Sequence, residues 1–285
     1  MKVKKYATLA AAAAIMFLSA CKKENIDAAA EEFETTFELS SDQAIADNLT
    51  EDANDVLNEA AMDRNLMGGR TAEDVTTIAG TSGILSCATL TVTPLTGFPK
   101  TLTIDFGVGC TSANGITRSG KITVVMSDSL RRPGSTSVMT FTNYFVNGFK
   151  KEGTITWTNT STPGTRSWQR KVENGKITAP GGAYWLHSGL KNVTQTAGVA
   201  TPLQLLDDVY SITGNHTVTN PAGRTRTGNI LDALQKKTAC ENVDKGRIKI
   251  DGPNHFAIID FGDGTCDRLA TISIDGRPAR TILLR

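Results

Sequence analysis

The sequence is poor in the residues and motifs on which most enzymes depend. Its 285 residues include three histidines, His187, His216 and His255, which lie in unrelated stretches. It contains no G-x-S-x-G, H-E-x-x-H or G-x-x-x-x-G-K-S/T pattern, the signatures of serine hydrolases, zinc proteases and phosphate-binding loops. We therefore predict that the protein is not an enzyme, while a hydrolase built on two facing carboxylates stays open.

Short cysteine pairs and basic stripes are missing as well. No two of the five cysteines have the C-x₂₋₄-C spacing that zinc sites usually take. The basic residues do not gather into a stripe with interleaved aromatic residues, and aromatic residues make up only 6% of the chain, which argues against nucleic-acid binding. The sequence thus predicts no metal ion, no cofactor and no nucleic-acid partner.

No apolar stretch of the sequence is long enough to cross a bilayer. The apolar run near the N-terminus, residues 7–17, has eleven residues, whereas a transmembrane helix needs about 20. It follows three lysines, as the apolar part of a signal peptide does. Residues 1–20 are therefore predicted to be a leader that is removed on export.

The leader ends in Leu18-Ser19-Ala20-Cys21, which resembles a bacterial lipobox. The resemblance implies that Cys21 is diacylated and becomes the new N-terminus, so that lipid anchors the chain to a membrane without a spanning segment. Lys22, and not aspartate, follows the cysteine, which implies the outer membrane. The start "CKKEN" also resembles the export tags of surface lipoproteins from the Bacteroidetes. We expect the body at the cell surface, with the periplasmic face as the alternative.

Acidic and basic residues are unevenly distributed along the chain. Residues 22–66 contain 13 acidic and 3 basic side chains, a net charge of −10, whereas residues 67–285 contain 16 acidic and 24 basic ones, a net charge of +8. The opposite charges could fold the acidic segment back on the basic body. Alternatively, the body could face an anionic partner such as a glycan, or both segments could be solvated. The sequence leaves these three alternatives open.

Four cysteines remain once Cys21 is assigned to the lipid. An even number of cysteines in an exported chain indicates disulfides, and three pairings are formally possible. The sequence separations of 23 and 26 residues, and the similar motif on which each pair closes, favour Cys87–Cys110 and Cys240–Cys266. In the chain-entropy model each bond stabilises the fold by about 3 kcal/mol.

The mature chain divides into three segments of different pattern. Residues 21–39 are acidic and are predicted to form a flexible tether. In residues 40–70 apolar side chains recur at helical spacing, Ser41 can cap the start of a helix, and Gly68-Gly69 can stop it. From residue 71 to 285, stretches rich in Thr, Val and Ile alternate with polar residues, which predicts a β-rich body.

Turn signals separate the predicted strands. Four pairs supply the positive φ of a type I′ hairpin turn: Asn114-Gly115, Asn147-Gly148, Asn174-Gly175 and Asp275-Gly276. Hairpins in series form an antiparallel meander with one face toward a core. The sequence therefore predicts a mainly β fold, either a meander with a twisted sheet or a sandwich-like wrap, with an N-terminal helix.

The sequence Ile-Asp-Phe-Gly occurs twice, and a cysteine follows each copy: "IDFGVGC" at 104–110 and "IDFGDGTC" at 259–266. A motif that recurs with a partner cysteine upstream is most simply a structural turn used twice. As a kinase motif it lacks the accompanying Gly-rich and His-Arg-Asp loops. In the second copy, Asp260, Asp263 and Asp267 lack the terminal glutamate of an EF-hand, which leaves a calcium loop as the weaker alternative.

The three tryptophans lie within 29 positions of one another. On an exposed sheet face they would form a platform for an anionic glycan, with arginines beside them. The alternative is that they fill the core, because a chain with few aromatic residues needs them there. The residues of the predicted platform are Trp157, Trp168, Tyr184, Trp185, Arg166 and Arg170.

Most of the body resembles an uncharacterised group of Bacteroidetes outer-membrane lipoproteins. The resemblance rests on "DFGVGCTSANGITRSGKI", "FKKEGTITWTN", "DDVYSITGNHTVTN" and "DFGDGTCDRLATISIDGRPARTILL", and it implies no activity. Asp128-Ser129-Leu130 also matches the O-glycosylation pattern of that phylum, which implies a glycan on Ser129. We expect a lipid-anchored, non-enzymatic surface module for binding or structure. The alternative is a periplasm-facing accessory lipoprotein that binds lipid or an envelope assembly.

Overall fold

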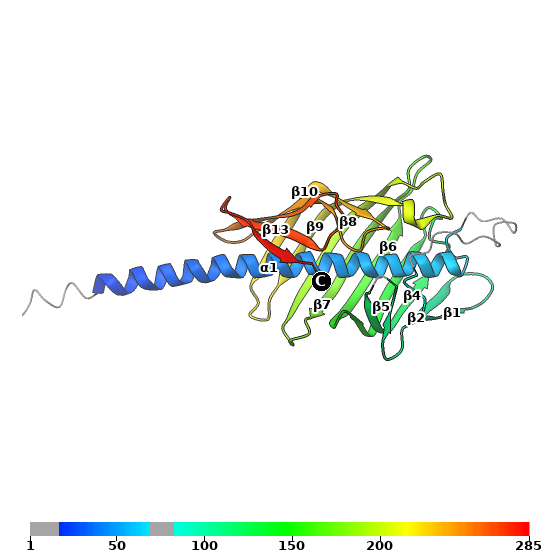
Figure 1. Ribbon diagram of the computed structural model, residues 1–285, viewed down its shortest axis with the longest axis horizontal. Helices are drawn as coiled ribbons and strands as arrows, with labels where there is room; N and C mark the ends of the chain where they lie inside the picture. The colour runs from blue at the N-terminus through cyan, green and yellow to red at the C-terminus, as the bar shows by residue number, and fades with distance from the viewer. Residues whose placement is uncertain (1–16, 69–82, 114, 285) are drawn as a thin grey trace, which may run out of the picture.

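The computed structural model describes residues 17–68, 83–113 and 115–284, with side chains described from residue 28 on. Most of the predicted leader, residues 1–16, lies outside the described residues. The fold is mainly β, as the sequence predicts. One long helix, α1 (Phe17–Asp63), lies along the concave face of a single antiparallel sheet of 14 strands (Figure 1).

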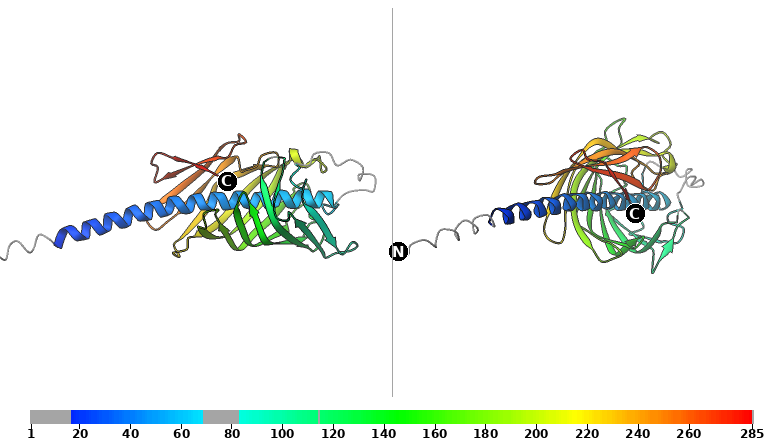
Figure 2. Two further views of the ribbon diagram at one scale, coloured as in Figure 1. Left: turned by 60° about the horizontal axis from the view of Figure 1, so that its bottom comes forward. Right: turned by 60° about the vertical axis from the view of Figure 1, so that its left-hand side comes forward.

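The strands follow one another round the sheet in the order of the chain, apart from a short strand that pairs only with β4. They are β1 (Thr89–Thr93), β2 (Lys100–Asp105), β3 (Cys110–Thr111), β4 (Thr117–Met126), β5 (Thr136–Val146), β6 (Phe149–Asn159), β7 (Ser167–Thr178), β8 (Tyr184–Ala197), β9 (Val209–Thr219), β10 (Thr225–Lys237), β11 (Lys245–Asp251), β12 (Phe256–Asp263), β13 (Leu269–Ile274) and β14 (Arg280–Leu283). The path of paired strands runs from β1 to β14 and stays open. Figure 2 shows the sheet curving round α1, whose N-terminal part projects beyond the sheet.

Bulges bend the sheet round the helix. The pairing of β6 with β7 shifts register between residues 152 and 154. There Gly153 has φ 109°, and a Cβ on it would lie 2.6 Å from the carbonyl oxygen of Asn174 on the neighbouring strand. Only glycine allows so close an approach of two backbones, and bulges of this kind increase the local bend of a strand.

Two of the predicted hairpin turns are confirmed and one is wrong. Asn147-Gly148 joins β5 to β6, and Asp275-Gly276 lies between β13 and β14. Asn174-Gly175 instead lies inside β7 as a bulge, because the strand pairs with β6 and β8 on both sides of it. The positive φ of Asn174, 52°, serves the bulge as well as it would serve a turn. Asn114, of the remaining pair, lies outside the described residues.

Helix α1 is longer than the sequence predicts. Residues 21–39 were expected to form a flexible tether, but the backbone is helical from Phe17 through Asp63. Three acidic residues of this segment, Glu31, Glu32 and Glu34, form ion pairs with arginines of the body. Glu32, for example, lies 3.0 Å from Arg226 on β10. A window of sequence cannot show such long-range pairs, which offset the charge repulsion that would otherwise oppose helix formation.

The helix ends before the predicted glycine pair. Asn65 has φ 56°, and the N–H of Leu66 donates to the carbonyl of Ala61 at 2.7 Å, which is the pattern of a Schellman cap. Asparagine can take this left-handed conformation because its short side chain is tolerated there. Gly68 lies beyond the cap, and Gly69 lies outside the described residues.

Buried ion pairs join α1 to the concave face of the sheet. Arg118 on β4 holds Asp52 with two hydrogen bonds, Nη2 to Oδ1 at 2.5 Å and Nε to Oδ2 at 3.0 Å. Lys191 on β8 lies 2.5 Å from Asp47. Further pairs along the same interface are Arg170–Glu51 at 2.5 Å, Lys236–Asp55 at 2.8 Å and Arg226–Glu32 at 3.0 Å. Of the three arrangements that the charge distribution allows, the structure has the acidic segment folded onto the basic body.

The positions of the carboxylates set the register of the helix. Four of them are spaced by four residues: Asp47, Glu51, Asp55 and Glu59. Consider a shift of α1 by one turn that places the helix residue four positions later opposite each cation of the sheet. Three of those cations would still face carboxylates. The same shift would replace Asp52 by Val56 opposite the buried guanidinium of Arg118. An unpaired buried charge costs about 3–5 kcal/mol, so Asp52 excludes the shifted register.

Apolar side chains fill the space around these pairs. One side of this core is an apolar stripe along the helix, and the other side consists of the apolar residues at inward-facing positions of the strands. Among the described residues, α1 contains no stretch that is apolar enough over a sufficient length to cross a membrane. Fully buried members of the core include Leu49, Val56, Leu57, Ile104, Ile122, Ile212, Ile248 and Ile259.

The first Ile-Asp-Phe-Gly copy runs from the end of β2 into a turn, as predicted, whereas the second lies inside β12, where the pairing with β11 shifts register. The carboxylate of Asp105 accepts a hydrogen bond from the N–H of Gly107 at 2.9 Å, and Asp260 accepts one from Gly262 at 2.9 Å. The phenylalanine of each copy is buried. Each aspartate therefore accepts a hydrogen bond within its own copy, and the aromatic ring of the copy packs into the core beneath it.

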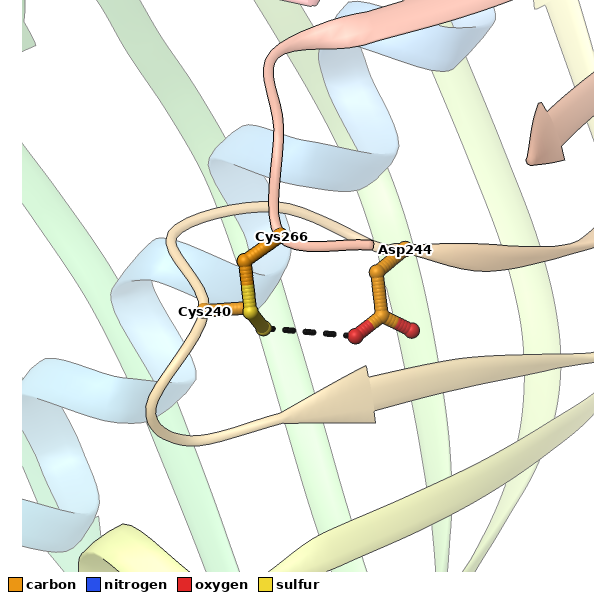
Figure 3. Close-up of side chains that lie close together, drawn as sticks. All are labelled: Cys240, Asp244 and Cys266. Carbon is orange, nitrogen blue, oxygen red and sulfur yellow. Dashed lines mark hydrogen bonds between the residues drawn. A yellow bond between two sulfur atoms is a disulfide. The ribbon is translucent and has the colours of Figure 1, made fainter. Parts of the chain in front are cut away.

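Both predicted disulfides, Cys87–Cys110 and Cys240–Cys266, are present. Asp244 lies beside the second, with a carboxylate oxygen 3.3 Å from Sγ of Cys240 (Figure 3). These two cysteines and Asp244 are the kinds of side chain that bind metal ions, and their ligand atoms lie within 4.8 Å of one another. The disulfide uses both sulfurs, so this group does not form a metal site in the oxidised protein.

Candidate functional site

A surface cleft lies at the end of the body where α1 ends. Three connections form its walls: residues 127–135 between β4 and β5, 160–166 between β6 and β7, and 198–208 between β8 and β9. Its volume is about 460 Å³, which is in the range of small-molecule binding sites. The residues that line it are Gly68, Asp128, Ser129, Arg131, Arg132, Arg166 and Pro202.

Three arginines make the cleft positively charged. Arg132 has a side chain that is 70% exposed, and its Nη1 lies 3.2 Å from the carboxylate of Asp128. Arg131 donates to the carbonyl of Pro202 at 2.9 Å. Arg166, on the opposite wall, is partly buried. Three guanidinium groups and one carboxylate line the cleft, and Asp208 lies near enough to interact with Arg131 and Arg166. The excess of positive charge among the lining residues favours an anionic ligand.

A smaller cavity, which we call the crevice, adjoins the cleft. Arg131 lines both, and the volume of the crevice is about 30 Å³. Trp168 contributes one wall and donates from Nε1 to the carbonyl of Leu130 at 3.3 Å. The Nε1 of Trp157 is buried and has no hydrogen-bond partner among the described residues. Also lining the crevice are Asn54, Leu57, Asn58, Met67, Val193, Gln195 and Tyr210.

Buried polar residues support the wall that carries Arg166. Its Nη1 donates to Oε1 of Gln195 at 3.4 Å. Gln195 in turn donates to Asp208 at 2.7 Å, and the hydroxyl of Tyr210 donates to the same carboxylate at 2.9 Å. Burial is the main reason that the pKa of Asp208 rises to about 6. This chain of hydrogen bonds restricts the positions available to the Arg166 guanidinium.

The six residues of the predicted platform do not share one exposed face. Trp157 and Trp185 are buried, because they occupy strand positions that point toward the helix. Arg170 is also buried, in its ion pair with Glu51. Tyr184, next to Trp185, points outward and is 37% exposed. The prediction of a sheet-face platform is therefore wrong, and the alternative of a core role holds for Trp157 and Trp185.

Part of the prediction is nevertheless brought together at one place. Trp157 and Trp168 line the crevice, whereas Arg166 and Ser129 line the cleft beside it. Ser129 is partly buried, so a glycan attached to it would occupy space in the cleft. Three of the six residues, Trp157, Trp168 and Arg166, are therefore brought together, but at the end of the sheet and not on the outer face of a strand.

Sequence reasoning missed Arg131 and Arg132. They are adjacent and come directly before Pro133 in the connection between β4 and β5. Two arginines in a short loop are a weak signal by themselves. Their significance comes from Arg166, which is far away in sequence and lies across the same cleft.

The predicted calcium alternative has no support from the second Ile-Asp-Phe-Gly copy. Asp263 accepts hydrogen bonds from the N–H and the hydroxyl of Thr265, at 3.0 and 2.8 Å. Asp267 accepts one from the N–H of Leu269 at 2.9 Å. Each carboxylate thus caps its own turn, so these aspartates are not arranged around a common centre.

Two of the three histidines are buried on the concave face beside the helix. Burial lowers the pKa of His187 well below its usual range and lowers the pKa of His216 to about 4. Both are therefore neutral at pH 7. The hydroxyl of Ser188, the nearest candidate nucleophile in sequence to His187, lies 2.7 Å from the hydroxyl of Thr217. This pairing gives no support to a catalytic triad at His187.

Lys151 gives the helix–sheet interface a specific pH dependence. It is buried on β6 and donates to the hydroxyl of Thr50 at 3.0 Å. Burial is the main reason that its pKa falls to about 7. Between pH 7 and about 10.4 the unfolded chain therefore binds a proton at this lysine that the folded chain does not, so the lysine's contribution to folding stability rises with pH.

We expect the variant Lys151→Met to lose this rise. Urea unfolding at pH 7, 8 and 9 should give a free energy of unfolding for the wild type that increases relative to that of the variant. Groups that the two proteins share cancel in this difference. A constant difference across the three pH values would contradict a lowered lysine pKa.

No family model, no curated protein and no solved structure matches this chain.

Proposed function

We propose that this chain is a lipid-anchored protein of the outer membrane that presents a non-enzymatic binding site at the cell surface. Lipid on Cys21 would hold it to the membrane. The observation that supports this role is that Cys21 lies near the start of α1, whereas the cleft lies at the end of the body where α1 ends. Figure 1 shows the start of α1 projecting away from the sheet. An anchor at one end of a rod and a charged cleft at the other suit a protein that captures a ligand away from its own membrane.

The length of the helix supports a display role. Cys21 and Asp63, the last residue of α1, are 42 positions apart. At a rise of 1.5 Å per residue this is about 60 Å. The cleft would thus lie well beyond the headgroups of the anchoring membrane, so a ligand from outside fits this geometry better than a lipid of that membrane.

The residues of the cleft favour binding over hydrolysis. Asp128 is the only carboxylate among its described lining residues, and it pairs with Arg132. Glycoside hydrolysis generally needs two carboxylates across the reacting bond. A basic cleft with one paired carboxylate is better suited to hold an anion than to transfer a proton.

The alternative role, a periplasmic protein that holds lipid inside a β-wrap, has less support. The concave face of the sheet would be the natural place for such a lipid. Here α1 occupies that face and pairs its carboxylates with the cations of the sheet. A lipid could enter only if the helix left.

Protease treatment of intact cells tests the proposal. An epitope placed after Arg285 should be removed by added protease, while a known periplasmic protein in the same cells survives. Cys21→Ala should release the protein from the membrane fraction, because the lipid anchor is lost. Protection of the epitope until the outer membrane is opened would contradict surface exposure and would favour the periplasmic role.

A further inference from the structure

We propose that the cleft and the crevice together bind an acidic sugar that carries an N-acyl group. This inference rests on the binding role proposed above and names the class of ligand for the same site. The cleft would hold the acid group, and the crevice would hold the acyl group. Each half of the assignment follows from different residues.

The cleft selects the acid. Guanidinium groups present N–H donors in a planar fork that matches the two oxygens of a carboxylate. Arg132 and Arg166 stand on different walls of the cleft, in the β4–β5 and β6–β7 connections. Arg132 is mostly exposed, and among the described residues its guanidinium pairs with the carboxylate of Asp128, so a ligand carboxylate can exchange for it at low cost.

The lining of the cleft favours a polar ligand over a lipid. Apart from Pro202, the residues along it are polar, charged or glycine. Its volume of about 460 Å³ is in the range of sites for small ligands. A sugar acid presents hydroxyl groups to such walls, whereas an acyl chain would find no apolar surface of matching length.

The crevice selects the acyl group. Its volume of about 30 Å³ is too small for a ring but is enough for a group the size of one or two water molecules. Leu57, Leu130 and Val193 make part of its wall apolar, which suits a methyl group. An acetyl methyl is of the right size for this space.

An unpaired hydrogen-bond donor in the crevice points to the rest of the group. Trp157 is 6% exposed, and its Nε1 has no hydrogen-bond partner among the described residues. A buried donor without a partner costs about 1–3 kcal/mol. A small shift of the crevice wall that uncovers Nε1 would let the carbonyl of an acetamido group accept this hydrogen bond while its methyl contacts the leucine and valine side chains.

The cleft and the crevice are close enough for one sugar to reach both. Arg131 lines the two cavities, Ser129 lines the cleft, and Leu130, between them in sequence, lines the crevice. A single residue that carries both a carboxylate and an acetamido group can therefore contact both. We therefore expect the site to select ligands that carry the carboxylate and the acetamido group together, over ligands that carry only one of them.

Four sugars can separate the contribution of the acid group to the binding affinity from that of the acyl group. Titration of the full-length lipidated protein in detergent would use N-acetylneuraminic acid, which has both groups, and glucuronic acid, which has only the acid. N-Acetylglucosamine has only the acyl group, and glucose has neither. We expect the first to bind at least tenfold more tightly than the second and the third, with glucose weakest.

Variants assign each contribution to its residues. Arg132→Gln together with Arg166→Gln should lower the affinity for both acidic sugars at least tenfold and leave N-acetylglucosamine unchanged. Val193→Ile adds a methylene to the crevice and should remove the advantage of N-acetylneuraminic acid over glucuronic acid. Lys171→Gln, which removes one charge from a lysine that is 54% exposed on β7, is the control and should change nothing. Unchanged circular dichroism and unfolding midpoints would show that the variants fold.

Three results would overturn the inference. Equal affinity for the two acidic sugars would remove the acyl assignment, and equal affinity for charged and neutral sugars would remove the acid assignment. No binding of any of the four sugars by the folded protein would remove both. The experiment on intact cells would still decide the proposed surface role, so the two proposals can fail separately.

Discussion

Replacing Asp52 by alanine is expected to lower the free energy of unfolding by about 3–5 kcal/mol. The variant removes the carboxylate that accepts two hydrogen bonds from the guanidinium of Arg118, at 2.5 and 3.0 Å, and leaves that guanidinium buried. Both side chains are almost fully buried, at 0% and 2% exposure. Urea unfolding monitored by circular dichroism would measure the change.

A surface pair on the same helix provides the control. Glu34 pairs with Arg280 at 3.0 Å, but both side chains are about half exposed, at 52% and 49%. Glu34→Ala should therefore cost no more than about 1 kcal/mol. The double variant Asp52→Leu with Arg118→Met should recover most of the stability, because it removes both charges. If Asp52→Ala cost as little as Glu34→Ala, the buried pair would not be holding the helix.

Replacing Trp185 by alanine should be about as damaging, with a loss of about 3–5 kcal/mol. The side chain is 3% exposed and points from β8 toward the helix side of the sheet. Removing it leaves a cavity in addition to losing the free energy of burial. The midpoint of denaturant unfolding should fall accordingly, while the slope stays that of the wild type.

Its neighbour in sequence is the matched control. Tyr184 is 37% exposed and points to the other face, and Lys176 lies over its ring at 4.5 Å. Tyr184→Ala should cost about 1 kcal/mol or less, because this contact is on the surface. Equal losses for the two variants would contradict the assignment of opposite faces to the two side chains.

The β architecture was accessible from the sequence because its signals are local. Alternating Thr and Val or Ile residues indicate strands, and Asn147-Gly148 or Asp275-Gly276 indicates a turn within four residues. The cysteine pairs were accessible for a related reason, since the motif around each pair repeats. Asn174-Gly175 misled because a bulge and a hairpin turn need the same backbone conformation, and only the pairing of neighbouring strands decides between them.

The helix and the site depended on contacts far apart in the sequence. The charge imbalance between residues 22–66 and the rest allowed the acidic segment to fold onto the body as one of three alternatives, but it did not reveal that Asp52 pairs with Arg118. In the same way, Arg166 could be noted beside Trp168, whereas its position across the cleft from Arg132 follows from the curvature of the sheet. Secondary-structure propensity is a property of short sequence windows, whereas these pairs join residues that are far apart in the sequence.

The position of α1 inside the sheet also determines how the molecule would carry a mechanical load. A ligand held in the cleft would pull on the loops of the sheet, and the proposed lipid anchor at Cys21 would pull on the start of the helix, along its axis. The ion pairs from Glu32 to Asp55 lie along that axis, so the pull would shear them together and would not peel them apart one at a time. In this geometry the contacts between α1 and the sheet are loaded in parallel, so the helix is pulled out of the sheet only when many of them break together.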